Sequence, residues 1–314
     1  MRNVQRDKKK RFVRMFKRDW QLHLLLLIPV IYTLIFSYGP IYGVQIAFRA
    51  YTPVKGITGS DWVGLKWFAK FLGTYNFMQI FTNTVILAAY SLITIFPLSI
   101  ILALLLHAMR GEKYKRVIQT VSYMPHFIST VVIVGIMNMV LSPSSGLYGA
   151  IYRLFGGEGF PPDFRASEAA FRHLYVWSGV WQQLGWSSII FIAALSSVSN
   201  ELHEAAQLDG ASRLKRMWYI DIPAILPTIC ILLIQRVSGL VSVGFEKAYM
   251  MRSALNVRVS EVIETFIYTH SMSSFTNYSF GAAVGLFNAA IHFVLMWTAN
   301  RITKKLTEGE VSYF

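Results

Sequence analysis

The sequence has 314 residues, of which 54% are hydrophobic and only 15% are charged. Soluble domains carry about 25% charged residues, and the mean hydropathy of +0.44 points the same way. These values exclude an ordinary soluble enzyme and predict an all-α integral membrane protein, because isolated helices satisfy their own backbone in lipid.

The chain begins with a basic arm, residues 1–20. Its cations are Arg2, Arg6, Lys8, Lys9, Lys10, Arg11, Arg14, Lys17 and Arg18. The net charge of +14 would also suit nucleic acid, but the arm leads directly into an apolar segment, so anionic membrane lipid is the better partner. Phe12, Phe16 and Trp20 recur near helical spacing and predict an amphipathic helix that anchors the arm at the inner interface.

Six apolar blocks follow within residues 21–305, and a short cytoplasmic tail, 306–314, ends the chain. Each block is long enough for a helix that crosses a bilayer, which takes about 20 residues. The six predicted spans are 22–46, 84–109, 118–141, 174–200, 222–245 and 276–300.

Orientation follows from the loops that carry Lys and Arg. Besides the arm, these are the loop "RGEKYKR" at 110–116, the loop with Arg213, Lys215 and Arg216, and the tail region with Arg301, Lys304 and Lys305. With six spans all four lie on one side, so both termini are expected in the cytoplasm.

Two further patterns concern the outer side. "VSEVIETFIY" predicts a short helix with Val262 and Phe266 on one face and Glu261 and Glu264 on the other. "GAAVG" at 281–285 has the small-residue spacing of a tight helix crossing.

The loop between the fourth and fifth predicted spans, residues 201–223, is polar and contains residues that begin and end helices. Asn200 suits a helix N-cap, Gly210 ends that helix, and Ser212 caps a second short helix. Pro223 either stops this second helix or opens the fifth span at a first-turn position, where no amide is needed. This pattern predicts a helix, a glycine bend and a helix beneath the membrane.

The loop resembles the EAA loop of the permease subunits of ATP-binding-cassette importers. The match "EAAxxDGAxxxxxxxxIxxPxxxP" covers Glu204, Ala205, Ala206, Asp209, Gly210, Ala211, Ile220, Pro223 and Pro227. The chain from about residue 20 onward is also similar to the oligosaccharide and polysaccharide branch of this family, in "SEVIETFIY" and in the last span.

The resemblance implies the transmembrane domain of a type I importer in the cytoplasmic membrane of a bacterium. Its expected partners are a second related permease, or less favourably a second copy, two ATPase subunits and an extracytoplasmic solute-binding protein. Glu204 to Gly210 would transmit force from the ATPases, and Arg213, Lys215 and Arg216 would add polar contacts to them.

The sequence has no phosphate loop of the G-x-x-x-x-G-K-[ST] type, so ATP and Mg²⁺ are expected on the partner ATPases and no cofactor in this chain. "HEAAQ" at 203–207 begins like a zinc protease helix, but Gln207 replaces the second histidine. No metal site is predicted. The predicted spans contain neither paired acids nor a nucleophile with a base, so an enzyme is not expected.

Polar residues within the spans are candidates for the substrate pathway. They are Trp181, Gln182, Gln183, Gln235, Arg236 and Asn288. Arg236 would bind sugar hydroxyls or a sugar carboxylate, or else pair within the bundle. Trp181 beside two amides suits a sugar face, whereas Trp177 fits an interfacial belt and Asn288 and His292 fit helix-to-helix hydrogen bonds.

We therefore expect the permease of an ATP-driven carbohydrate importer, with an acidic substrate if Arg236 faces the cavity. The alternatives are a permease of the same architecture for a non-sugar solute and, less favourably, an intramembrane enzyme.

Overall fold

The computed structural model describes residues 18–109, 111–271 and 277–306, which are helices joined by loops. The only β pairing among these residues is an isolated bridge between Arg49 and Trp62. Most of the basic arm and the tail after residue 306 lie outside the described residues, as do Arg110 and part of the loop before the last helix. The all-helical prediction is confirmed for the described chain.

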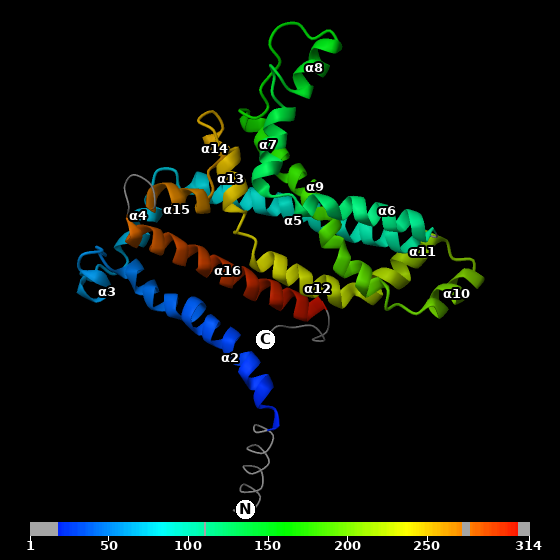
Figure 1. Cartoon of the computed structure of the whole chain (residues 1–314), viewed down its shortest axis with the longest axis horizontal. Coiled ribbons are helices and arrows are strands. Elements are labelled where there is room, and N and C mark those ends of the chain that lie inside the picture. Colours follow the sequence, from blue (N-terminus) through cyan, green and yellow to red (C-terminus); the bar gives the residue numbers. More distant parts are fainter. Residues whose placement is uncertain (1–17, 110, 272–276, 307–314) are drawn as a thin grey trace, which may run out of the picture.

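The first apolar element is nearly continuous from Trp20 to Phe48. It consists of α2 (Trp20–Thr33), the π-helical η1 (Leu34–Tyr38) and the 3-10 helix η2 (Gly39–Phe48). None of α2 is buried in the chain, and Figure 1 shows it diverging from the other long helices. A helix that is apolar all round and touches little of its own chain presents its surface to lipid or to another subunit.

The body of the molecule is formed by four long elements that run roughly along its length (Figure 1). They are α5 (Phe77–Ala108), α9 (Glu168–Leu195), α12 (Ile222–Ser238) and α16 (Tyr278–Leu306). One buried cluster joins α5 and α9 through residues such as Leu87, Val176 and Val180. Another joins the C-terminal half of α5 to α9 and α12 through Leu104, Phe191 and Ile225.

Shorter helices complete the fold, and many of them lie at the end away from the polar hairpin. They are α3 (Gly56–Gly59), α4 (Lys66–Leu72), α8 (Leu147–Leu154), α13 (Phe245–Met251), α14 (Val257–Ser260) and α15 (Ile263–Ser271). Gly281 of α16 lies so close to Ser271 of α15 that a Cβ would clash, whereas Gly285 has open space beside it. The predicted tight crossing is therefore found at the first glycine alone.

The third predicted span, 118–141, is not one straight helix. The chain forms α6 (Glu112–Tyr123), the 3-10 turn η3 (Met124–Phe127) and α7 (Thr130–Val140), with a bend of 98° between the two arms. Pro125 ends the first helix because it lacks an amide proton, and the hydroxyl of Ser129 accepts from the amide of Val132 at 3.4 Å to begin the next.

Among the described residues, four helices are long and apolar enough to cross a membrane, and the bent pair would make a fifth. The four are Trp20–Phe48, Phe77–His107, Arg213–Ser238 and Tyr278–Lys305. The predicted fourth span corresponds to α9, which is long but more polar. Six crossings and cytoplasmic termini thus remain predictions.

Candidate functional site

The polar hairpin is built from α10 (Asn200–Leu208) and α11 (Arg213–Arg216). Ser199, and not the predicted Asn200, caps α10, since its hydroxyl accepts from the amide of Glu201 at 3.2 Å. The predicted cap at Ser212 is confirmed by a bond of 3.4 Å from the amide of Lys215. The second helix continues through the π turn η4 (Met217–Asp221) into α12. Pro223 therefore lies in the first turn of α12, which is the second of its two predicted roles.

Gly210 closes α10 in the left-handed region, at a φ of +76°. The amide of Ala211 bonds to the carbonyl of Ala206 at 2.8 Å, and that of Gly210 to Gln207 at 3.1 Å. This pair of bonds defines a Schellman motif, which satisfies the free carbonyls at a helix end. Arg216 then joins the two helices through the carbonyl of His203 and the side chain of Gln207.

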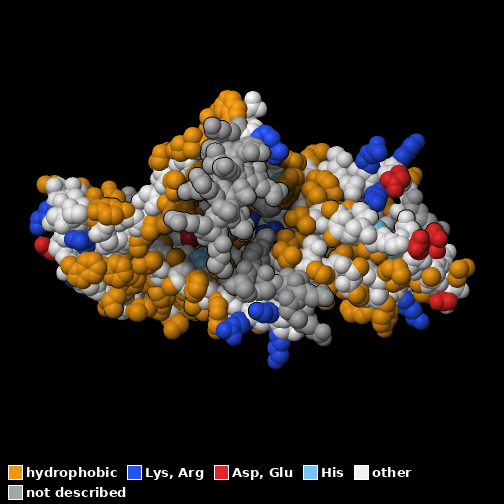
Figure 2. Space-filling model, turned by 90° about the horizontal axis from the view of Figure 1, so that it is seen from below, with side chains coloured by type: hydrophobic (Ala, Val, Ile, Leu, Met, Phe, Trp, Pro, Cys, Tyr) orange, Lys and Arg blue, Asp and Glu red, His pale blue; other side chains and the backbone are white. Residues whose placement is uncertain are grey.

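The tip of the hairpin is exposed. Glu204, Ala205 and Asp209 are open to solvent, and the side chain of Leu208 is 90% exposed. Figure 2 shows charged side chains gathered at this end of the molecule, while hydrophobic side chains cover much of its length. An exposed leucine among charged groups at the tip of a rigid hairpin is suited to a protein partner. The sequence motif contains Leu208, but its exposure becomes evident only in the fold.

A cavity of about 480 Å³ lies between α5, α9 and α12. Its lining is mostly apolar, with polar groups from Ser91, Ser99, Ser187, Gln235, Arg236 and Ser242. The guanidinium of Arg236 donates to the hydroxyl of Ser187 at 3.0 Å. Arg236 thus has a partner within the bundle, as the alternative expects. It also lines the cavity, and its binding of a sugar stays a prediction.

The other pathway candidates lie elsewhere. Gln182 is buried and donates to the carbonyl of Ile128 at 3.0 Å, while Gln183 bonds to His126 at 3.1 Å. Both amides therefore hold α9 against the bend between α6 and α7. Trp181 is half-exposed outside the cavity lining. Asn288 is also absent from the lining, and its Oδ1 is buried without a hydrogen bond.

His292, by contrast, makes the predicted contact between helices. Its Nδ1 bonds to the carbonyl of Ser238, and its Nε2 lies 3.4 Å from the hydroxyl of Ser242. Both partners lie at the end of α12 or just beyond it.

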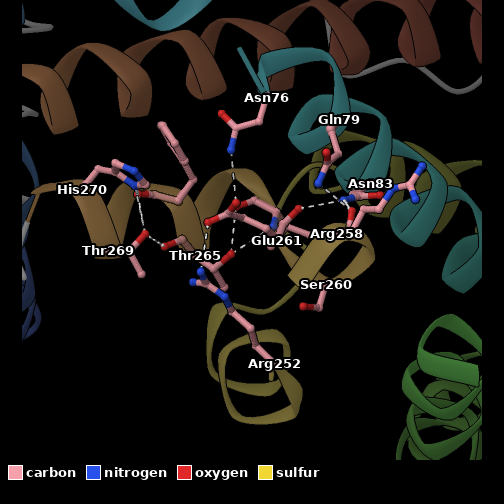
Figure 3. Close-up of polar contacts among 12 residues, drawn as sticks. Asn76, Gln79, Asn83, Arg252, Arg258, Ser260, Glu261, Thr265, Thr269 and His270 are labelled. Atoms are coloured by element: carbon pink, nitrogen blue, oxygen red, sulfur yellow. Dashed lines mark hydrogen bonds and ion pairs between the residues drawn. The ribbon is translucent and has the colours of Figure 1, made fainter. Parts of the chain in front are cut away.

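A polar cluster surrounds Glu261 between α14 and α15 (Figure 3). Its carboxylate lies 3.3 Å from the guanidinium of Arg252 and accepts from Asn76 at 3.3 Å. Asn83 and Gln79 of α5 donate to the carbonyl of Arg258. Glu261 precedes α15, which begins at Ile263, so it does not share a helical face with Glu264 as predicted. It is only 6% exposed, because Asn76 and Arg252 pack against it.

A second cavity, of about 350 Å³, opens beside this cluster and is lined by Asn76, Gln79, Arg252, Arg258 and His270 among others. No sequence pattern indicates this cluster, because Asn76 and Glu261 lie 185 positions apart.

Comparison with known proteins identifies the family. Residues 95–308 match the family described as "Binding-protein-dependent transport system inner membrane component". The chain belongs to this family. The permease is 39% identical over 303 residues to the polygalacturonan/rhamnogalacturonan transport system permease protein YteP of Bacillus subtilis, covering 96% of this chain and 94% of the relative.

Solved structures share its fold as well. One is a crystal structure of a bacterial ABC transporter involved in the import of the acidic polysaccharide alginate, with a TM-score of 0.86 and 33% identity over 95% of the permease and 99% of the matched chain. The alginate transporter in complex with an alginate pentasaccharide-bound periplasmic protein matches with a TM-score of 0.85, 32% identity and coverage of 95% and 98%. The permease thus has the all-helical fold of ABC importer permeases.

Proposed function

We propose that this permease carries an acidic oligosaccharide or polysaccharide across the cytoplasmic membrane, driven by partner ATPases that dock on the hairpin of α10 and α11. The observation that carries the proposal is the exposed, rigidly closed hairpin at residues 200–216, which bears the family's EAA motif. ATP and Mg²⁺ would be bound by the partners, and this chain would catalyse no reaction.

The rest of the assembly follows from the same proposal. A second, related permease would cover α2, which is unburied in the isolated chain, and a solute-binding protein would dock at the end that carries α8. The alginate transporter has been crystallised with its periplasmic protein, which supports this partner. With α9 as a further crossing and the bent α6–α7 segment as one, the chain would span the membrane six times.

The ATPase contact can be tested by co-purification. Leu208→Arg places a charge where a partner would bury an apolar side chain. Burial of a leucine is worth about 2 kcal/mol, so recovery of the ATPase with the tagged permease should fall at least tenfold. Leu154→Arg is the matched control, because Leu154 is 82% exposed in the distant α8. Equal recovery with both variants would contradict the docking site.

The substrate class depends on Arg236 in the cavity between α5, α9 and α12. A guanidinium whose partner in the chain is the neutral Ser187 can bind a sugar carboxylate. The name of the Bacillus subtilis relative and the alginate structure both point to polymers that contain acidic sugars.

Uptake of oligogalacturonate in cells tests this assignment. Arg236→Leu should raise the concentration for half-maximal uptake by about tenfold or more, the value of a lost charged hydrogen bond, and Arg236→Lys should lose less. Arg301→Leu, at the far end of α16 from the cavity, is the control. An unchanged preference for acidic over neutral oligosaccharides in Arg236→Leu would remove the acidic substrate from the proposal.

A further inference from the structure

Three metal-binding side chains from different elements meet where the hairpin joins the bundle. His107 lies at the end of α5, His203 in α10 and Asp221 in η4. Each offers a ligand atom, and these atoms all lie within 4.8 Å of one another. The second imidazole that α10 lacks, because Gln207 occupies its place, is thus supplied by α5.

The contacts within this group are incomplete. Nε2 of His203 and Oδ1 of Asp221 are 3.1 Å apart, yet neither buried atom makes a hydrogen bond of good geometry. Asp221 is 3% exposed, and a buried carboxylate is costly unless it is paired or coordinates a metal. A cation at this point would bind both atoms at once.

The donor set and spacing suit a divalent transition metal. Two imidazoles and one carboxylate are a ligand set found in zinc sites with an open fourth position for water. In tetrahedral zinc, bonds of about 2.0 to 2.2 Å place neighbouring ligand atoms roughly 3.3 to 3.6 Å apart. The His203–Asp221 separation is already near this range, and the widest pair must close by about 1 Å.

We propose that His107, His203 and Asp221 form a Zn²⁺ site that ties the coupling hairpin to α5 and to the start of α12. Zinc would restrain α10 against the bundle and so oppose the hairpin movement that transport requires. This consequence rests on the proposed function, whereas the binding of zinc does not.

The test is zinc binding by the full-length permease, purified in detergent with an affinity tag that contains no histidine. The unsubstituted chain should bind about one equivalent of Zn²⁺, and Zn²⁺ should raise its melting temperature. His203→Ala, His107→Ala and the isosteric Asp221→Asn should each weaken binding about tenfold or more. His173→Ala and Asp61→Asn, outside the group, are the matched controls.

The melting temperature without zinc shows whether each variant folds, so a loss of binding in a folded variant supports the site. Binding that is as tight in His203→Ala and Asp221→Asn as in the unsubstituted chain overturns it. Zinc should also slow ATP-driven uptake by the unsubstituted complex and not by the Asp221→Asn complex. Uptake without any zinc effect in a chain that binds zinc would leave the site intact and refute its influence on transport.

Discussion

At the scale of single residues, Lys247 is a buried ionisable group outside the long apolar helices. Its ammonium donates to the carbonyl of Tyr175 at 2.8 Å and lies 4.7 Å from the centre of that residue's ring. Burial lowers the pKa of Lys247 to about 8. The side chain joins α13 to α9 at the cost of a buried charge.

This shift predicts a pH-dependent stability. Between the folded pKa near 8 and the unfolded value near 10.4 the unfolded chain binds more protons, so the free energy of unfolding should rise with pH. The rise should reach at most about 3 kcal/mol and disappear in Lys247→Met. Thermal unfolding at pH 7.5 and 9.5 measures it, with Lys113→Met as the exposed control. The same rise in Lys247→Met would contradict the assignment.

Glu261 provides a second prediction at this scale. Removing its carboxylate leaves the guanidinium of Arg252 and the amide of Asn76 without their acceptor, so Glu261→Ala should lower the free energy of unfolding by roughly 3 kcal/mol. Glu246→Ala, at an exposed position in α13, should change it by less than about 0.5 kcal/mol. Denaturant titration of both variants makes the comparison, and equal losses would show that the cluster is not stabilising.

The sequence singles out Arg236 and Gln235, which both line the cavity between α5, α9 and α12, because polar groups are rare inside apolar helices. It could not predict the roles of Gln182 and Gln183, whose partners Ile128 and His126 lie 54 and 57 positions away. Nor could it find the His107–His203–Asp221 group, which depends on how three separate elements are placed.

At the scale of elements, the hairpin could be predicted because its signals are local: a cap at Ser212, helix formers in α10 and a glycine at the turn. The bend between α6 and α7 was missed, although Pro125 is a local signal, because the apolar run at 118–141 was long enough for one span. Hydropathy measures length and composition, whereas the path of the chain depends on the caps within the run.

Gly210 allows a direct test of the hairpin turn. Its φ of +76° suits glycine, and a Cβ built there would meet nothing within 4 Å, so Gly210→Ala should cost only the backbone strain of about 1 to 2 kcal/mol. Hydrogen exchange of the amides at 206–211 should accelerate about tenfold. Gly210→Asn should exchange more slowly than Gly210→Ala, because asparagine tolerates this region. Equal exchange in the two variants would contradict the strain argument.

At the scale of the whole molecule, the chain presents three surfaces that the proposed assembly would use. The apolar α2 is unburied, the polar hairpin exposes Leu208, and the cavity with Arg236 lies between helices of a single subunit. Each of these surfaces matches one partner in the proposed assembly: a second permease, an ATPase and an acidic sugar.

The most direct test is uptake of labelled oligogalacturonate into vesicles that contain the complete complex with its binding protein. The account predicts uptake that requires enclosed ATP, is lost in the Leu208→Arg complex and persists in the Leu208→Met complex, which keeps an apolar side chain at this position. Uptake that proceeds without ATP, or that Leu208→Arg leaves unchanged, would contradict the claim that the hairpin couples this permease to ATP hydrolysis.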